Sequence, residues 1–225
     1  MIKNDNILII APHPDDEVLG GGGIMKKYAD ADQQVFSLIV SRGTPKLYSD
    51  EKIQNVREEA RNAHHLLGVK ETIFLDFPAP ELDTISVSEI SRAIAQEIKK
   101  LSIRIVYLPH RGDIHHDHRI VFNAGLVACR PVGQYSVKEI YTYETLSETE
   151  WAAPFGDDAF IPTKFVNITE QMKYKLEAMK CFKSQVRTFP NSRSLETIEA
   201  LAKYRGATVG FERAEAFMLI RNIEN

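Results

Sequence analysis

Several features are scarce or missing in this chain of 225 residues, and each narrows its class. The two cysteines, Cys129 and Cys181, lie far apart and belong to no motif, so a disulfide framework is not expected. No stretch approaches the roughly 20 apolar residues of a membrane span, and the N-terminus lacks a signal-peptide pattern. The net charge of -3 gives no reason to expect nucleic acid or an anionic membrane as a partner. We therefore expect a soluble, cytoplasmic protein.

The composition permits one sizeable hydrophobic core. Hydrophobic residues make up 44% of the chain, and α/β domains of this length are ordinary. No internal repeat or low-complexity linker divides the sequence. We therefore expect a single domain over residues 1–225.

Strand and helix patterns alternate along the first two thirds of the chain. Short apolar runs predict strands, and apolar residues that recur with helical spacing predict helices, one of them closed by Gly68. The predicted strands cover 6–11, 34–40, 72–75 and 101–108, and the predicted helices cover 50–67 and a segment that opens at Ser86. This alternation is typical of an α/β, Rossmann-like fold with a largely parallel sheet flanked by helices.

The C-terminal third is less regular. We expect strands at 138–143 and 216–221, helices at 169–183 and 194–204, and a loop at 151–162. A long irregular loop is often functional, so 151–162 is a candidate wall or lid of a pocket. The loop at 41–49 is a second candidate for controlling specificity.

Five of the seven histidines lie in two short clusters rich in carboxylates, at 11–17 and 110–118. Imidazole nitrogens and carboxylate oxygens are ligands that zinc accepts, and a catalytic zinc site typically has three protein ligands and one open position. The first cluster can supply two ligands and the second can supply one. The sequence therefore predicts a metal site with acid/base groups beside it.

The first cluster directly follows the predicted strand 6–11. Prolines on both sides of His13 end the strand and restrict the backbone, which fixes the orientation of His13 at the carboxyl end of the strand. Open α/β sheets bind their ligands at that edge. His13 and Asp16 can point to one side of the strand-to-helix turn, so Asp15 must point elsewhere. A carboxylate close to the metal but outside its ligand set is suited to accept a proton from water.

The second cluster follows the predicted strand 101–108 in the same way, so both clusters should meet at one edge of the sheet. The segment from Asp117 onward predicts the start of a helix, with an acidic residue in its first turn. In His115-x-Asp117-His118, one histidine can bind metal while the other stays free as a general acid or oxyanion donor. The aspartate is close enough to hold the tautomer of the free ring.

These residues resemble the LmbE/PIG-L-like zinc-dependent de-N-acetylases, which remove acetyl groups from N-acetylglucosamine-type amino sugars. The specific matches are the Pro-His-Pro-Asp-Asp-Glu block at 12–17 and the His-x-Asp-His block at 115–118. Weaker similarities extend over nearly the whole chain, at 18–23, 59–68, 77–78, 193–196, 204–206 and 214–217. The resemblance implies a hydrolase that acts on a small-molecule amino sugar or its conjugate. Relatives are frequently oligomers, so a homo-oligomer is compatible with the resemblance, although no sequence feature fixes a subunit number.

Carried over position by position, the resemblance implies a role for each clustered residue. Zinc, or another divalent transition metal, is the implied cofactor. The implied metal ligands are His13, Asp16 and His118, the implied general base is Asp15, and the implied helper of the oxyanion or leaving amine is His115, with Asp117 behind it. The expected reaction is metal-assisted amide hydrolysis, in which Asp15 accepts a proton from water and the metal and protonated His115 stabilise the oxyanion.

Two positions depart from the family pattern. His116 stands where relatives often carry proline, which makes it an alternative ligand or a metal-competing neighbour, although we favour His118. Val56 stands where an arginine often contacts substrate, and Arg57 is the neighbouring candidate for that contact. His110 is a candidate either for a hydrogen bond at the strand end or for a place in the pocket.

Other features have structural explanations. His64 and His65 lie on the predicted helix with no evident carboxylate partner, so we expect surface or packing roles for them. The glycines at 20–23 lack the G-x-G-x-x-G spacing of a dinucleotide loop. We expect them instead to allow close packing of a helix against the sheet.

Three other functions would use some of the same features. A metal-dependent hydrolase of an ester, a formamide or a thiol-conjugate amide would use the same residues. A phosphohydrolase would need an oxygen-rich site of the kind that magnesium prefers. A non-catalytic Rossmann-like nucleotide-binding module would bind nucleotide tightly without metal.

Overall fold

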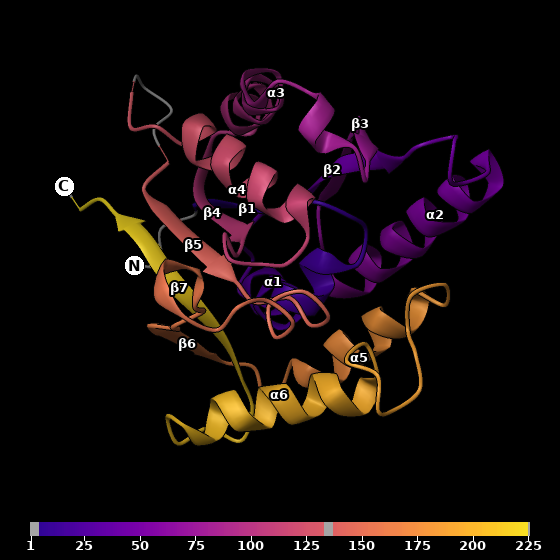
Figure 1. Cartoon of the computed structure of the whole chain (residues 1–225). Coiled ribbons are helices and arrows are strands. Elements are labelled where there is room, and N and C mark those ends of the chain that lie inside the picture. The colour runs from indigo at the N-terminus through magenta and orange to yellow at the C-terminus, as the bar shows by residue number, and fades with distance from the viewer. Residues whose placement is uncertain (1–4, 133–136, 225) are drawn as a thin grey trace.

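A computed structural model describes residues 5–132 and 137–224, in which seven strands form one sheet with helices on both faces (Figure 1). In chain order the elements are β1 (Asn6–Ala11), α1 (Asp16–Asp30), β2 (Val35–Gly43), α2 (Asp50–Leu67), β3 (Glu71–Ala79), the 3₁₀ helix η1 (Leu82–Thr84), α3 (Val87–Lys100), β4 (Ile103–Pro109), α4 (His116–Ala128), β5 (Glu139–Tyr143), the 3₁₀ helix η2 (Gly156–Asp158), β6 (Lys164–Asn167), α5 (Met172–Cys181), α6 (Leu195–Ala207) and β7 (Ala214–Asn222).

The sheet has the strand order β3-β2-β1-β4-β5-β7-β6. The first five strands of the chain pair in parallel, and β7 and β6 add an antiparallel edge. The predicted Rossmann-like, largely parallel sheet flanked by helices is therefore confirmed. β6 was not predicted, because its four half-buried residues show no clear alternation and β7 supplies its pairing.

Both faces of the central strands are buried. In β1, Ile7 and Ile9 pack toward α1, α2, α5 and α6, whereas Leu8 and Ile10 pack toward α3 and α4. This burial explains why β1 is a continuous apolar run rather than an alternating one. Figure 1 shows the two helical layers on opposite sides of the sheet.

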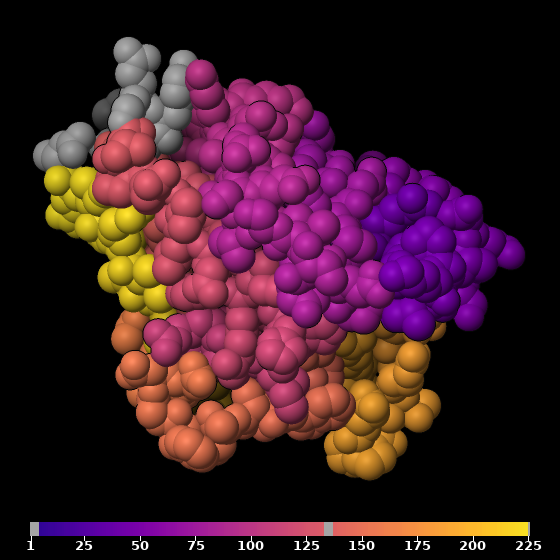
Figure 2. Space-filling view, turned by 45° about the horizontal axis from the view of Figure 1, so that its top comes forward, coloured from indigo at the N-terminus to yellow at the C-terminus, as the bar shows by residue number. Residues whose placement is uncertain are grey.

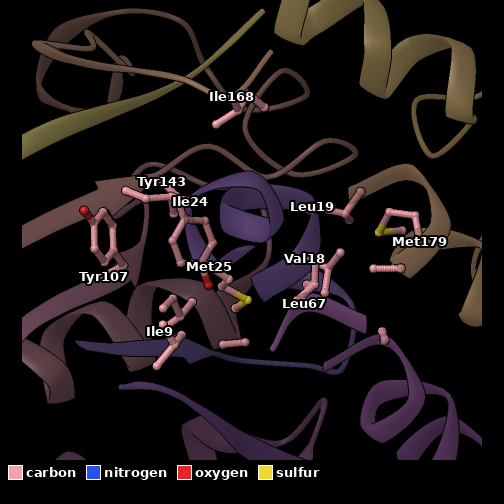
Figure 3. Close-up of a cluster of buried hydrophobic side chains, with 14 of the residues drawn as sticks. Ile9, Val18, Leu19, Ile24, Met25, Leu67, Tyr107, Tyr143, Ile168 and Met179 are labelled. Carbon is pink, nitrogen blue, oxygen red and sulfur yellow. The ribbon is translucent and has the colours of Figure 1, made fainter. Parts of the chain in front are cut away.

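The glycines of α1 bring the helix close to the sheet. A Cβ added to Gly20 would lie 2.1 Å from the ring of Tyr143, and a Cβ added to Gly23 would lie 2.8 Å from Ile168. The Tyr143 hydroxyl is fixed in turn, because it donates to the carbonyl of Ile10 at 2.8 Å. The packing role expected for this segment is confirmed, and Figure 3 shows α1 enclosed by side chains from the sheet and from the C-terminal third.

A buried ion pair bridges a break in α1. Gly21 has the non-helical backbone angles φ -141° and ψ 15°, which leave helical N–H and C=O groups without their usual partners. Beyond the break, the carboxylate of Glu215 accepts hydrogen bonds from the N–H groups of Gly23 and Ile24 at 2.7 Å each. The Lys175 ammonium donates to the carbonyl of Leu19 and to Glu215, both at 2.7 Å. Residues from α5 and β7 thus stabilise the helix that begins at the candidate site.

The C-terminal third also covers part of the molecular surface. Figure 2 shows its orange residues below the magenta N-terminal part and its yellow residues at the left edge of the molecule. The Ser184 hydroxyl donates to Glu59 of α2 at 2.6 Å, so the segment after α5 reaches across to α2. Cys129 is buried, Cys181 is half-buried, and both are free thiols. None of the helices in 5–132 and 137–224 is both long and apolar enough to cross a membrane.

We expect Lys175→Met to lower the free energy of unfolding by about 3–5 kcal/mol, because it leaves the Glu215 carboxylate buried without its cation. Urea denaturation measures the change. The control is Lys203→Met, which removes an exposed partner of Glu199 and should cost less than about 1 kcal/mol. Similar losses in the two variants would contradict the structural importance of the buried pair.

Candidate active site

The two histidine clusters meet where the order of the strands reverses. β1 lies between β2 and β4. The chain runs from β1 to β2 and β3 on one side of β1, and then crosses from β3 to β4 on the other side. Ligands of open α/β sheets bind outside the carboxyl ends of the strands at this point. His13 follows β1 and His118 lies in the first turn of α4, directly after the β4 loop. The convergence predicted from the two strand ends is therefore observed.

Three side chains form the centre of the site. Nδ1 of His13 lies 3.3 Å from Oδ2 of Asp16, and Nε2 of His118 lies 3.2 Å from the same oxygen. One potential ligand atom from each of the three lies within 4.8 Å of the others. Asp16 and His118 are fully buried, whereas His13 is partly open to the pocket.

The remaining nitrogen of each ring is bonded to another carboxylate. Nε2 of His13 lies 2.8 Å from Oδ2 of Asp117, and Nδ1 of His118 lies 2.7 Å from Oδ2 of Asp113. Carboxylates in this position orient histidine ligands and increase their basicity. Sequence reasoning did not single out Asp113, although it lies within the second cluster five residues before His118.

These carboxylates make the centre favourable for positive charge. Burial alone would lower the pKa of both rings, but hydrogen bonds and charge from the neighbouring carboxylates outweigh it. The pKa of His13 rises to about 9 and that of His118 to about 10. The same carboxylates would stabilise the positive charge of a divalent cation.

The donor set fits such a cation. Oδ1 of Asp16 and Nε2 of His118 are buried and have no hydrogen-bond partner among the described residues. Unpaired polar atoms of this kind are costly in a protein interior unless they bind something. Two imidazole nitrogens and one carboxylate oxygen match a zinc-type site with an open position.

A second grouping is geometrically possible. His13, His115 and Asp117 also bring ligand atoms within 4.8 Å of one another. In that grouping the Asp117 carboxylate is already bonded to His13. Within the part of the chain that the structure describes, neither His110 nor His116 belongs to either group.

Asp15 faces the pocket while its neighbour Asp16 faces the histidines. Asp15 has φ 107° and ψ -28°, and this positive φ turns two consecutive carboxylates apart. Burial raises the pKa of the Asp15 carboxyl well above its ordinary value, and the charge of Arg193 opposes that rise. The two carboxylates thus have different surroundings, as predicted from the three-residue spacing of His13 and Asp16.

Arg193 is a site residue that sequence reasoning missed. It comes from the segment between α5 and α6, and its Nη1 lies 3.2 Å from Oδ2 of Asp15. Its Nη2 lies 3.7 Å from Glu148, and its Nε donates to Ser147 at 2.7 Å. The only signal in the sequence was the family-like stretch at 193–196.

The expected state of His115 is wrong. Burial and the nearby His13 lower the pKa of His115 to about 4, so the ring is neutral at neutral pH rather than protonated. Its Nδ1 accepts from the backbone N–H of Asp117 at 3.1 Å, which places the ring proton on Nε2. The Asp117 carboxylate, expected to hold this ring, instead bonds to His13, and its backbone N–H contacts His115.

A pocket of about 660 Å³ adjoins these residues, within the usual size of a small-molecule site. Its lining includes His13, Asp15, Ser41, Arg42, Tyr48, Val56, Arg57, His115, Glu148, Gln185, Arg187 and Arg193. The pocket is therefore bounded by the end of β2 and the loop after it, by α2 and by the segment after α5.

One of the two predicted specificity loops lines this pocket and the other does not. The predicted 41–49 loop contributes Tyr48 and also Ser41 and Arg42, which belong to the end of β2, whereas no residue of 151–162 lines the pocket, so the predicted lid is wrong. The 151–162 loop packs on the β4 loop instead, where the carbonyl of Asp158 lies 2.9 Å from Nε2 of His110. Because that loop contacts His110, His110 has a hydrogen-bonding role at the strand end.

Arg57 lines the pocket, but its guanidinium is already engaged. It pairs with Asp76 and lies over the ring of Phe74, 4.6 Å from the centroid. Val56, the neighbouring residue, also lines the pocket. Substrate contact by Arg57 would require it to leave these partners.

The two helix histidines differ. His65 is exposed, as expected. His64 is buried, and its Nε2 lies 2.9 Å from Oε1 of Glu17. The expectation that it lacks a carboxylate partner is therefore wrong. The partner, Glu17, lies on α1, far from His64 in the sequence, so no local pattern indicates the contact.

Residues 8–129 match the family described as GlcNAc-PI de-N-acetylase, PIG-L. The chain belongs to this family. An uncharacterized deacetylase of Escherichia coli, YaiS, is 32% identical over 188 residues, which cover 81% of this chain and 92% of that protein. A diacetylchitobiose deacetylase of Thermococcus kodakarensis is 28% identical over 228 residues, with coverages of 96% and 84%. The structure of an N,N'-diacetylchitobiose deacetylase from Pyrococcus horikoshii, in complex with its inhibitor, has a TM-score of 0.77 at 24% identity and covers 96% of this chain and 84% of that one.

Glu148 should make stability depend on pH. Burial raises its pKa to about 7 from an ordinary value of 4.5, so between about pH 4.5 and 7 the folded chain binds more protons than the unfolded chain. Stability therefore falls as pH rises through this window, and Glu148→Gln removes that loss. Urea unfolding below and above the window should show the variant gaining free energy of unfolding relative to wild type as pH rises. A difference that does not change with pH would contradict the assignment.

Proposed function

We propose that this PIG-L family member is a metal-dependent hydrolase that removes the N-acetyl group from an N-acetylglucosamine-type sugar or its conjugate. The observation that carries the proposal is the convergence of His13, Asp16 and His118 beside Asp15, next to a pocket of about 660 Å³ that His13 and Asp15 line. The diacetylchitobiose deacetylase among its relatives supports the substrate class. The proposal includes one catalytic domain over residues 1–225 and a cytoplasmic location.

The cation would be held by Nδ1 of His13, the carboxylate of Asp16 and Nε2 of His118. These are the atoms left available once Asp117 and Asp113 have engaged the other ring nitrogens. Zinc is the cation that this donor set favours. When bound, it supplies Lewis acidity toward the acetamide carbonyl and makes water a stronger acid at neutral pH.

The remaining residues handle the protons. Asp15 accepts a proton from the attacking water, and its raised pKa brings it closer to the operating pH, where a general base is most effective. Arg193 fixes the direction of that carboxylate. The Nε2–H of neutral His115 donates to the carbonyl oxygen as negative charge develops there. The proton on Asp15 then passes to the leaving amine, which releases acetate and the free amino sugar.

The alternatives from the sequence differ in how well they fit. Hydrolysis of another amide or an ester would use the same residues, so only product analysis separates it from deacetylation. A nucleotide-binding module is less well supported, because Gly20 and Gly23 pack against Tyr143 and Ile168 and leave no phosphate cradle there.

The function is tested by measuring acetate release from a panel of N-acetylated sugars. We expect release from at least one member, loss of release after chelation, and recovery when zinc is restored. Absence of acetate from every substrate, with metal bound at one equivalent, would rule out the deacetylase function.

We expect Asp15→Asn to retain bound metal but to lower turnover by about 10²- to 10⁴-fold, because it removes only the proton acceptor. His13→Ala should lose both metal and turnover. Elemental analysis and acetate release measure the two properties on the same preparations. Equal metal loss in the two variants would contradict the division of roles.

A further inference from the structure

A chain of three hydrogen bonds, two of them buried, connects β3 and α2 to the backbone of Asp15. The N–H of Asp15 donates to Oε2 of Glu17 at 3.2 Å. Nε2 of His64 lies 2.9 Å from Oε1 of Glu17, and Nδ1 of His64 lies 2.7 Å from the Thr72 hydroxyl. With the ring proton on Nε2, His64 donates to Glu17 and accepts from Thr72. No step of the proposed reaction uses Glu17 or His64 directly.

The backbone of Asp15 needs external support. A positive φ in a residue other than glycine costs about 1–3 kcal/mol and persists only where the surroundings fix it. As the residue before the first turn of α1, Asp15 also has an N–H with no partner inside the helix. Its side chain makes no capping hydrogen bond. The bond to Glu17 therefore holds the conformation that turns the Asp15 carboxylate away from Asp16.

Glu17 depends in turn on His64. Its carboxylate is fully buried, beside the carboxylates of Asp15 and Asp16. Across residues 5–132 and 137–224, His64 is its ion-pair partner, and the two carboxylate oxygens each take one hydrogen bond. A buried carboxylate deprived of such a partner is costly and tends to move. Movement of the Glu17 carboxylate would release the Asp15 N–H.

We propose that His64 is a positioning residue that acts through Glu17 to hold Asp15 in its working orientation. The inference rests on the proposed function, because Asp15 is the general base there. It differs from an ordinary packing role in one respect. Removal of the Nε2 donor should reduce turnover even where the space of the ring is filled.

The test compares His64→Leu with His64→Gln. Leucine fills much of the site without a donor, whereas the amide nitrogen of glutamine can reach the position of Nε2. We expect His64→Leu to lower kcat by about tenfold or more with KM and metal content unchanged, since small misplacements of reacting groups cost up to about 10²-fold. His64→Gln should recover most of the kcat, although both variants lose the bond to Thr72. The matched control is His65→Leu, at the exposed neighbouring position, which should keep the wild-type kcat.

Hydrogen exchange supplies a readout that does not need activity. The Asp15 amide should exchange faster in His64→Leu than in wild type and should remain protected in His64→Gln. Wild-type kcat in His64→Leu, or an equal loss of kcat in both variants, would overturn the inference. If His64→Leu does not fold, His64→Met also fills the site without a donor and should give the same loss of kcat, and an unchanged kcat would again overturn the inference. A wild-type protein that releases no acetate would defeat the proposed function, while the exchange comparison would still decide whether His64 holds Asp15.

Discussion

The site depends on the compensation of negative charge that has been removed from water. Four buried aspartates lie around one point of the sheet edge, and each carboxylate would be costly without a partner. The partners are imidazoles and one guanidinium, arranged as His13 with Asp16 and Asp117, His118 with Asp16 and Asp113, and Arg193 with Asp15. The same compensation that permits burial also orients the ring nitrogens toward a shared centre.

The fold creates this arrangement through strand order and local backbone shape. Because β1 and β4 are adjacent and parallel, the loops that follow them leave the same edge of the sheet. The positive φ of Asp15 then separates two consecutive carboxylates into different surroundings. The broken helix α1 begins at this point, and Lys175 and Glu215 stabilise it before and after the break, respectively. Conformational strain and buried charge are therefore concentrated in the residues nearest the reaction.

The features predictable from the sequence were those encoded locally. Strand 6–11, helix 50–67 and the two histidine clusters each have a signal within a few residues, and the fold places them as expected. Contacts between distant segments left no such signal, so Arg193 was missed and His64 was judged to lack a carboxylate partner. The charge state of His115 depends on burial and on neighbouring rings, which residue types alone do not reveal. β6 depends on pairing with β7 and has little pattern of its own.

The position of Arg193 has a consequence for how the protein matures. His13, Asp16 and His118 all precede it on the ribosome, whereas Arg193 is made only after α5 is complete. During vectorial synthesis the proposed cation ligands therefore emerge before the guanidinium that contacts Asp15. Under the proposed mechanism, hydrolysis requires translation to have passed Arg193, which lies in the last quarter of the chain.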